Sequence, residues 1–198
     1  MICLYDLRKK INELEEMMNW LDLSRPWPKG KSSNLGQTHM DIGYADNHPD
    51  LAQSVVPGVM LDVRASAADG HVGLGDVDRN GRAFSRVTKD SAVIFNTGWE
   101  QHFGSPEYDR SPDIDGDLVD ALIDRGAGLL MVDSPGLYGG ARSEAHTRMD
   151  LHVVDRGAIA VENLCNVDRL PTTFTLYCFP LNVEDQNWLP ARVVASWS

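Results

Sequence analysis

Gly36-Gln37-Thr38-His39-Met40-Asp41 is the most informative stretch of this sequence. His39 and Asp41 are two residues apart, and in an extended segment side chains at that spacing leave the same face of the chain. An imidazole and a carboxylate aimed at one point suit a divalent metal ion. A His-x-Asp triplet also occurs often in polar surface turns, so the motif becomes informative only together with the rest of the chain.

Further motifs follow this stretch, several of them at the ends of short apolar runs that predict buried strands. In chain order they are Phe95-Asn96-Thr97-Gly98-Trp99, Tyr108, Pro112, Gly128-Leu129-Leu130-Met131-Val132-Asp133-Ser134-Pro135, Gly157-Ala158-Ile159-Ala160-Val161-Glu162-Asn163-Leu164 and Phe179-Pro180-Leu181. Their order and spacing resemble the cyclase family of metal-dependent hydrolases, which includes bacterial kynurenine formamidase and isatin hydrolase. The resemblance covers about residues 22–198.

The resemblance implies one α/β domain with a swivelling β/β/α barrel-like fold over residues 22–198. The sequence pattern is compatible with that fold, because it predicts several short apolar strands and few helices. The expected strands lie within residues 20–28 and at residues 57–63, 91–95, 129–132, 159–161, 174–181 and 191–197. The expected helices of this domain lie at residues 117–125 and 142–156.

Residues 4–21 predict an extra N-terminal amphipathic helix, so the chain divides into a helix at 1–21 and a catalytic domain at 22–198. Apolar residues in this segment alternate spacings of three and four and form one narrow stripe: Leu4, Leu7, Ile11, Leu14, Met18 and Leu21. Such a helix fits either packing against its own domain or a dimerisation arm. We predict a homodimer or a larger homo-oligomer.

The sequence departs from the family within the metal motif. The family pattern is His-x-Gly-Thr-His-x-Asp-x-Pro-x-His, followed later by a Glu-Asn-Leu segment with a histidine before it. Aligned on His39 and Asp41, the family's histidines, glycine and proline are replaced here by Leu35, Gln37, Gly43, Ala45 and, before Glu-Asn-Leu, Asp150. The ligands that persist are His39, Asp41 and Glu162, and Asp150 offers a carboxylate as a fourth.

The resemblance implies that these four residues hold Zn²⁺ or Mn²⁺, with His39, Asp41 and Glu162 as both ligands and catalytic residues. A catalytic metal needs about three protein ligands and an open position. It lowers the pKa of bound water to about 7 and polarises a carbonyl oxygen. That chemistry would hydrolyse an amide, a lactone or a formyl group.

A general acid or base is also required, and the candidates are His48 and His146. His48 follows the metal motif in a loop that can bring it back in place of the family histidine missing at Ala45; the alternative is a solvated loop residue. Trp27, Trp99 and Phe103 are candidates for the aromatic wall of a substrate pocket, and core packing explains them at least as well.

Three functions remain open. The first is a metal-dependent hydrolase acting on a non-peptide C–N bond, as an arylformamidase does. The second is a family enzyme with a decayed metal site that catalyses cyclisation, dehydration or isomerisation in a biosynthetic pathway of secondary metabolism. The third is a small-molecule binding or scaffold protein that kept only the fold. Loss of the motif histidines favours the second function, and retention of His39, Asp41 and Glu162 favours the first.

The composition limits the classes of partner that the protein is expected to bind. The 198 residues carry a net charge of −11, which argues against nucleic acid and anionic membrane surfaces. No apolar segment is long enough to span a bilayer. Cys3, Cys165 and Cys178 form no disulfide framework, and the first residues lack a signal-peptide pattern. We therefore expect a cytoplasmic protein that acts on a small molecule.

Overall fold

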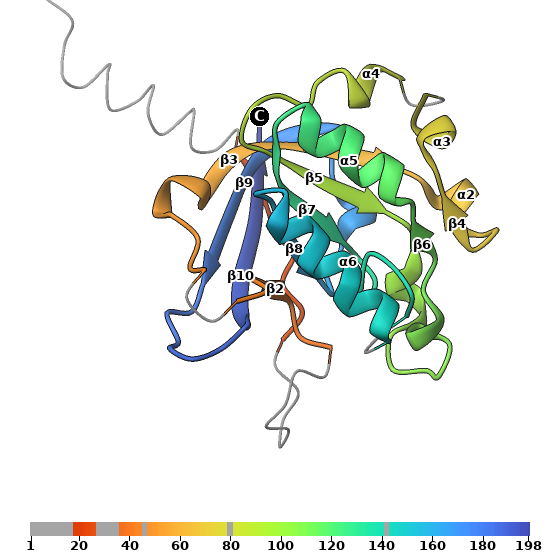
Figure 1. Cartoon of the computed structure of the whole chain (residues 1–198). Coiled ribbons are helices and arrows are strands. Elements are labelled where there is room, and N and C mark those ends of the chain that lie inside the picture. The colour runs from red at the N-terminus through yellow and green to blue at the C-terminus, as the bar shows by residue number, and fades with distance from the viewer. Residues whose placement is uncertain (1–17, 27–35, 45–46, 79–80, 141–142) are drawn as a thin grey trace, which may run out of the picture.

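The computed structural model describes residues 18–26, 36–44, 47–78, 81–140 and 143–198. In this part of the chain, seven strands close into a barrel in the order β10-β2-β8-β7-β5-β3-β9, and the ring closes through the β9–β10 pairing (Figure 1). Their bounds are β2 His39–Asp41, β3 Val55–Asp62, β5 Ser91–Asn96, β7 Ala127–Val132, β8 Ile159–Glu162, β9 Thr173–Pro180 and β10 Trp188–Trp197. An outer strand, β1 Asn19–Asp22, is added to β10.

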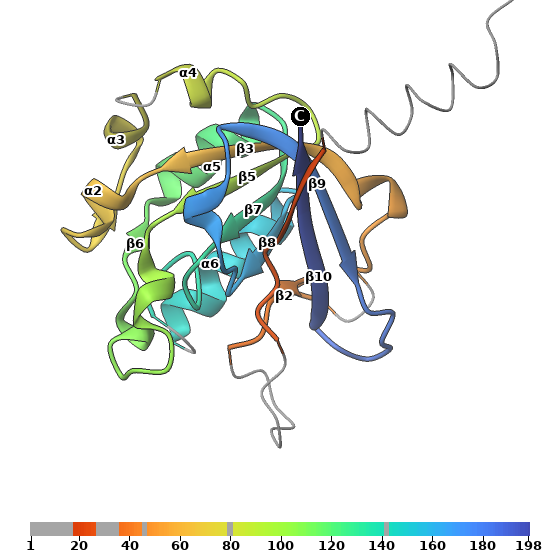
Figure 2. The ribbon, with the colours of Figure 1, turned by 180° about the vertical axis from the view of Figure 1, so that it is seen from behind.

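Helices cover one side of this barrel. The two longer ones, α5 Gly116–Asp124 and α6 Glu144–Asp155, lie against the strands β5, β7 and β8, as Figures 1 and 2 show from opposite sides. The shorter elements are α2 Arg64–Ala67, α3 Leu74–Asp78, α4 Gly81–Phe84, the 3-10 turns η1 Leu51–Gln53, η2 Trp99–His102, η3 Tyr108–Arg110 and η4 Val167–Arg169, and the strand pair β4 His71–Val72 with β6 Asp113–Ile114. Among the described residues, no helix is long and apolar enough to cross a membrane.

Alternation along the strands produces two separate cores. One fills the barrel and includes Met40, Val161 and Leu189; the other lies between the barrel and the helices and includes Ala160, Leu118 and Val153. Because strand side chains alternate between faces, the residues beside Met40 and Val161 point out of the barrel. His39, Asp41 and Glu162 therefore lie on the outer face, on the side that α6 covers.

The predicted fold class is confirmed: the structure is a single mixed α/β domain with a closed barrel and few helices. The predicted helices at residues 117–125 and 142–156 correspond to α5 and α6. The N-terminal prediction is wrong at its end. Residues 1–17 lie outside the described part, but Asn19–Asp22 form strand β1, because pairing with β10 inserts Leu21 into the barrel core. The spacing of apolar residues in the sequence carries no information about the pairing of β1 with β10.

Candidate metal centre

Strand pairing brings the first three candidate ligands together. His39 on β2 stands directly opposite Glu162 on β8, although the two residues are far apart in the sequence. The Nε2 atom of His39 lies 3.2 Å from Oδ2 of Asp41 and 3.5 Å from Oε2 of Glu162. His39 and Glu162 are buried, and Asp41 is partly open to solvent. The convergence expected from the sequence is thus present in the structure.

A second group is completed by helix α6. His146 and Asp150 lie one turn apart, and Nε2 of His146 is 3.2 Å from Oδ2 of Asp150. The same Nε2 is 3.7 Å from Oε1 of Glu162. Glu162 therefore presents one carboxylate oxygen to each histidine. Within each of the two groups, the candidate ligand atoms lie within 4.8 Å of one another.

Backbone and side-chain contacts orient His39. Its Nδ1 lies 3.0 Å from the carbonyl oxygen of Gln37. A hydrogen bond there places the proton on Nδ1 and turns the lone pair of Nε2 toward the carboxylates, which is the tautomer of a metal-ligating histidine. The adjoining Thr38 hydroxyl donates to the carbonyl of Asn163 at 2.8 Å, and Asn163 accepts a hydrogen bond from the Tyr108 hydroxyl at 2.9 Å. These bonds tie β2 to the segment after Glu162.

The donor set fits a divalent cation. Of the seven buried side-chain atoms without a hydrogen-bond partner in the described structure, four belong to this centre: Oδ2 of Asp41, Oδ1 of Asp150, Oε1 of Glu162 and Nδ1 of His146. Within the same residues, no lysine or arginine forms an ion pair with these three carboxylates. Buried carboxylates without a partner are costly, and a cation coordinated by the unsatisfied oxygens removes that cost.

Burial and mutual repulsion perturb the ionisation of the centre. Burial, followed by the charges of Asp41 and Asp150, raises the pKa of Glu162 well above its usual value. Burial and the charge of Asp41 raise the pKa of Asp150 to about 8. Burial alone would lower the pKa of His39, but the charge and contact of Asp41 raise it overall. Without a cation, Asp150 and Glu162 therefore hold protons to higher pH than ordinary carboxylic acids.

Comparison with known proteins identifies the family of this chain. The model of the family described as "Putative cyclase" matches residues 21–137, which is more than half of the chain. The chain belongs to the cyclase family. No protein in the curated set matches its sequence.

Solved structures share the fold across nearly the whole chain. Isatin hydrolase A from Labrenzia aggregata, bound to benzyl benzoate, has a TM-score of 0.77 at 18% identity, covering 96% of this chain and 98% of that one. Isatin hydrolase A from Ralstonia solanacearum has a TM-score of 0.76 at 16% identity, covering 100% and 98%. A protein described as a "potential metal-dependent hydrolase with cyclase activity" has a TM-score of 0.67 at 17% identity, covering 90% and 98%.

The metal motif of the cyclase family is altered in this chain, and His146 lies next to one of the substituted positions, Asp150. Asp150 stands at the position that the sequence comparison assigned to a family histidine. One turn earlier on α6, His146 supplies an imidazole to the same space. Sequence reasoning named His146 only as a candidate acid or base, although its i, i+4 relation to Asp150 was visible.

Gly136 makes room for that imidazole. A Cβ atom added at Gly136 would overlap Nδ1 of His146 and come within 3.3 Å of Oε1 of Glu162. A side chain at this position would therefore displace two candidate ligands at once. The requirement for glycine was not visible in the sequence, because the contact depends on how α6 packs against the loop after β7.

We expect Gly136→Ala to lower metal affinity and any metal-dependent activity by about 10- to 100-fold, the range seen when the surroundings of metal ligands are altered. The reason is displacement of His146 and of Oε1 of Glu162. Gly116→Ala is the matched control, since a Cβ there has no neighbour within 4 Å. Isothermal titration with Mn²⁺ compares the two variants. Equal affinity in both would contradict the assignment of Gly136.

The metal-free protein is expected to lose stability as pH rises from about 4 to about 8. Asp150 and Glu162 have raised pKa values in the folded state, so folding takes up protons and the free energy of unfolding falls with pH in this window. His39 acts in the same direction. Burial lowers the pKa of His146, so this one residue changes the stability in the opposite direction.

Melting temperature measured in a chelator at successive pH values checks this dependence. A decrease of several degrees toward pH 8 is expected, and Asp150→Asn should flatten the slope. Saturating Mn²⁺ should oppose the decrease, because ligands must be deprotonated to bind it. A chelated protein whose melting temperature rises across the window would contradict the coupling.

The other predicted site residues lie elsewhere or outside the described part. Trp27 is outside it, as are the substituted positions Leu35 and Ala45. His48 is an exposed residue of the loop after β2, and it is not a member of either ligand group found among the described residues. Its catalytic role stays a prediction, while His146 lies within the centre.

Trp99 and Phe103 border the centre indirectly. The indole N–H of Trp99 donates to the carbonyl of Tyr108 at 3.1 Å. The ring of Phe103 packs edge-on against Tyr108 and lies over Gly36, the first residue of the metal motif. Through Tyr108 and Asn163 these aromatics adjoin His39, and their contact with substrate stays a prediction.

Trp188 is an aromatic residue of the centre that sequence reasoning missed. It is the register partner of Asp41 on β10, and its ring meets the ring of His39 edge-on at 5.9 Å between centroids. In β10, Leu189 and Ala191 face the barrel core, so the alternating residues Trp188 and Pro190 point outward. This alternation is the sequence feature that could have indicated Trp188. The strand pairing that sets this side chain beside β2 was not readable from the sequence.

Proposed function

We propose that this cyclase-family protein is a metal-dependent hydrolase of a small amide, formamide, cyclic amide or lactone. The observation that carries the proposal is the position of Glu162 between His39 and His146, with unsatisfied buried atoms on both sides. The names of the similar structures, isatin hydrolase and metal-dependent hydrolase, support the same class. Arylformamidase-like action on a non-peptide C–N bond in secondary metabolism is the finer form of the proposal.

His39, Asp41 and Glu162 would hold one cation, and His146, Asp150 and Glu162 would hold a second. Three carboxylates and two imidazoles suit Mn²⁺ or Zn²⁺. When bound, such an ion supplies Lewis-acid activation of water and of a carbonyl oxygen. The open side for substrate is the side of Asp41, His146 and Asp150, because these three side chains retain some exposure to solvent.

The protein's own residues bind the substrate and move protons. In a chain with one cation at His39, His146 would hold no metal, and its imidazole beside Asp150 would accept a proton from the attacking water and return it to the leaving nitrogen. Buried Glu162 holds the imidazole of His146 in place on one side, and Gly136 lies against it on another. Trp188 offers a flat wall beside His39, which favours a planar substrate.

A second candidate function is a cyclisation, dehydration or isomerisation that uses the same residues without a metal. It is favoured by replacement of the family histidines at Leu35, Ala45 and Asp150. The carboxylates of Asp150 and Glu162 would then act directly as general acid and base. This alternative predicts a protein that is fully active in the presence of a chelator.

Elemental analysis of the purified protein tests the proposal. We expect about one or two equivalents of Mn²⁺ or Zn²⁺ per chain. Saturating ion should raise the melting temperature of the chelated protein, because it binds only the folded centre. Hydrolysis of a panel of aryl formamides, cyclic amides and lactones then identifies the substrate class. A protein without metal and without a thermal shift would exclude the hydrolase proposal.

A further inference from the structure

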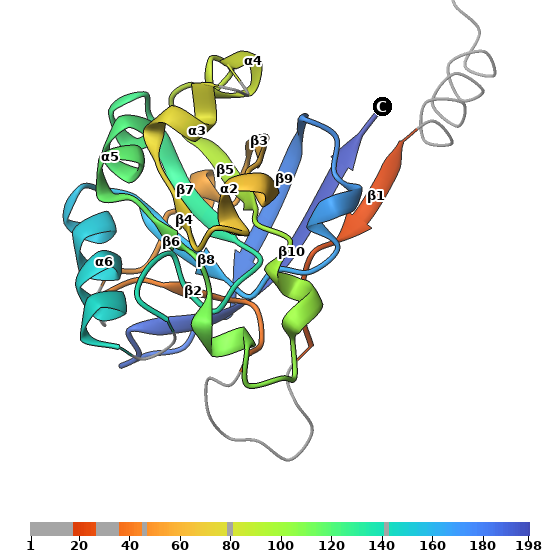
Figure 3. The same ribbon diagram turned by 90° about the vertical axis from the view of Figure 1, so that its right-hand side faces the viewer.

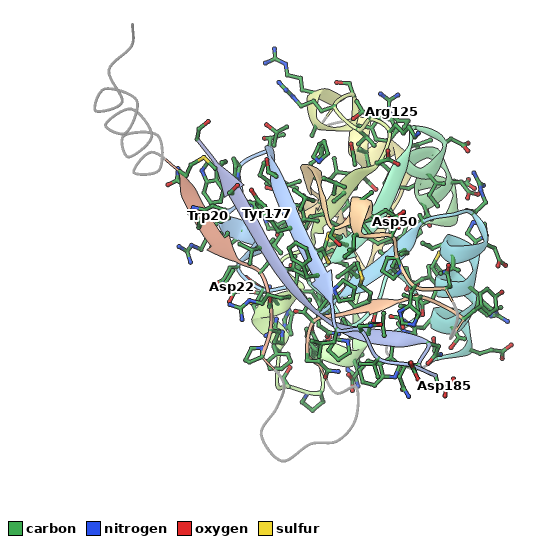
Figure 4. All side chains as sticks on the ribbon, turned by 90° about the vertical axis from the view of Figure 1, so that its left-hand side faces the viewer. Trp20, Asp22, Asp50, Arg125, Tyr177 and Asp185 are labelled. Atoms are coloured by element: carbon green, nitrogen blue, oxygen red, sulfur yellow. The ribbon has the colours of Figure 1, made fainter. Side chains whose placement is uncertain are left out.

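The side of the barrel opposite the helices carries an apolar surface without cover in the described structure. It is formed by outward side chains of β1, β10, β9 and β3. Figure 3 shows α5 and α6 on one side of the barrel and β1 on the other. We call it the bare barrel face and define it by Trp20, Val55, Tyr177, Phe179 and Val194. The rings of Trp20 and Tyr177 are 5.4 Å apart, side by side in Figure 4.

Strand alternation explains why these residues face outward. Their neighbours Leu21, Val56, Leu176, Cys178 and Val193 fill the barrel core, so the residues between them point away from it. Trp20 is 59% exposed, Val55 49% and Phe179 46%. On β3 the same outward row continues into Val59 and Leu61, which the helices bury. Helices therefore cover one end of the row and leave the other end open.

Neighbouring exposed apolar side chains, here Trp20, Val55 and Phe179, are a mark of an interaction surface. An exposed ion pair between Asp22 and Arg192, at 2.8 Å, flanks the patch between β1 and β10. An apolar centre with a charged edge is typical of protein interfaces.

The sequence supplies a segment that matches this face. Residues 4–18 carry an apolar stripe spaced at three and four, consisting of Leu4, Leu7, Ile11, Leu14 and Met18. The described chain begins at Met18, immediately before β1, so the segment joins the fold at the edge of the bare barrel face. Its apolar stripe has the chemistry needed to cover Trp20, Tyr177 and Phe179.

We infer that residues 4–18 of a second copy of this chain cover the bare barrel face. The segment of the same chain is a poor occupant, because it would have to reverse direction next to β1 and no glycine or proline lies between residues 1 and 24. Exchange between two copies needs no such reversal. A two-fold axis repeats the contact, so each copy covers the face of the other and the buried area doubles.

Mass measurement by light scattering on the full chain tests the interface. The wild type should have about twice the 21.9 kDa of one chain at micromolar concentration. Leu7→Glu with Ile11→Glu, and separately Val55→Glu with Phe179→Glu, should each give monomers with unchanged circular dichroism. Leu74→Glu is the matched control, because Leu74 is 43% exposed on α3, away from the face, and it should remain dimeric.

A cysteine pair distinguishes the second copy from the same chain. Ile11→Cys with Phe179→Cys, in a Cys3→Ser background, should form a covalent dimer on oxidation, and neither single cysteine should do so. A covalent bond within one chain would overturn the inference. A monomeric wild type, or a dimer that persists in the segment variant or the face variant, would overturn it as well.

Discussion

Glu162→Gln is expected to reduce metal-dependent turnover by about 10²- to 10³-fold, since Lewis-acid activation contributes several kcal/mol to the transition state. Glu162 is the single residue shared by both ligand groups, with one oxygen facing His39 and the other facing His146. An amide keeps the shape of the side chain but removes the charge and one acceptor oxygen. Bound metal should therefore fall at both positions rather than at one.

The stability of this variant separates loss of metal from loss of fold. Glu162 is a buried carboxylate beside two others, and burial and those charges raise its pKa well above its usual value. Replacing Glu162 by glutamine removes a buried charge and its repulsion by the other two carboxylates. Metal-free Glu162→Gln should therefore melt at the same temperature as metal-free wild type or higher. The increase in melting temperature on adding Mn²⁺ should shrink. Measurement of both melts by calorimetry gives the two results together.

Glu144→Gln is the matched control for this experiment. Glu144 lies on α6 two residues before His146, but its side chain is 86% exposed and pairs with Arg148. Exposed pairs of this kind contribute about 0–1 kcal/mol. This variant should keep its metal and its turnover. If Glu162→Gln kept both as well, Glu162 would not be a ligand.

The sequence predicted the barrel side of the centre because local rules determine it. His39 and Asp41 share a face by the period of two in a strand, and the apolar run before Glu162 predicts the strand that carries it. The same rule gave β5, β7 and β8 close to their observed bounds. Pairing of β2 with β8 was available only through the resemblance to a family, since nothing local connects residues so distant in the chain.

The helical side of the centre depends on tertiary packing and was predicted less well. The turn of α6 that carries His146 and Asp150 was expected, but the contact of His146 with Glu162 follows from the docking of α6 over β8. Gly136 and Trp188 contribute through neighbours that sequence spacing cannot reveal. Likewise, the helix expected at residues 4–21 overlapped the strand expected within residues 20–28, and the pairing of β1 with β10 decides for the strand.

Asp41→Asn, compared with chelation of the wild type, decides whether the reaction needs a metal. Asp41 contributes an oxygen 3.2 Å from Nε2 of His39, and that oxygen has no hydrogen-bond partner in the described structure. If the protein is a hydrolase, the variant and the chelator should each reduce turnover by about 10²-fold or more, because both remove the activated water. Added Mn²⁺ or Zn²⁺ should restore the chelated wild type and restore the variant poorly.

The metal-free alternative gives a different pattern in the same assay. Chelator should leave turnover unchanged, while Asp41→Asn still lowers it, because a carboxylate that positions or exchanges protons has been lost. Asp124→Asn is the matched control in both cases, since Asp124 is 71% exposed on α5 and pairs with Arg156. The four buried atoms without partners favour the metal-dependent pattern. Full activity in chelator together with a defective Asp41→Asn variant would overturn the hydrolase proposal and leave catalysis by the carboxylates alone.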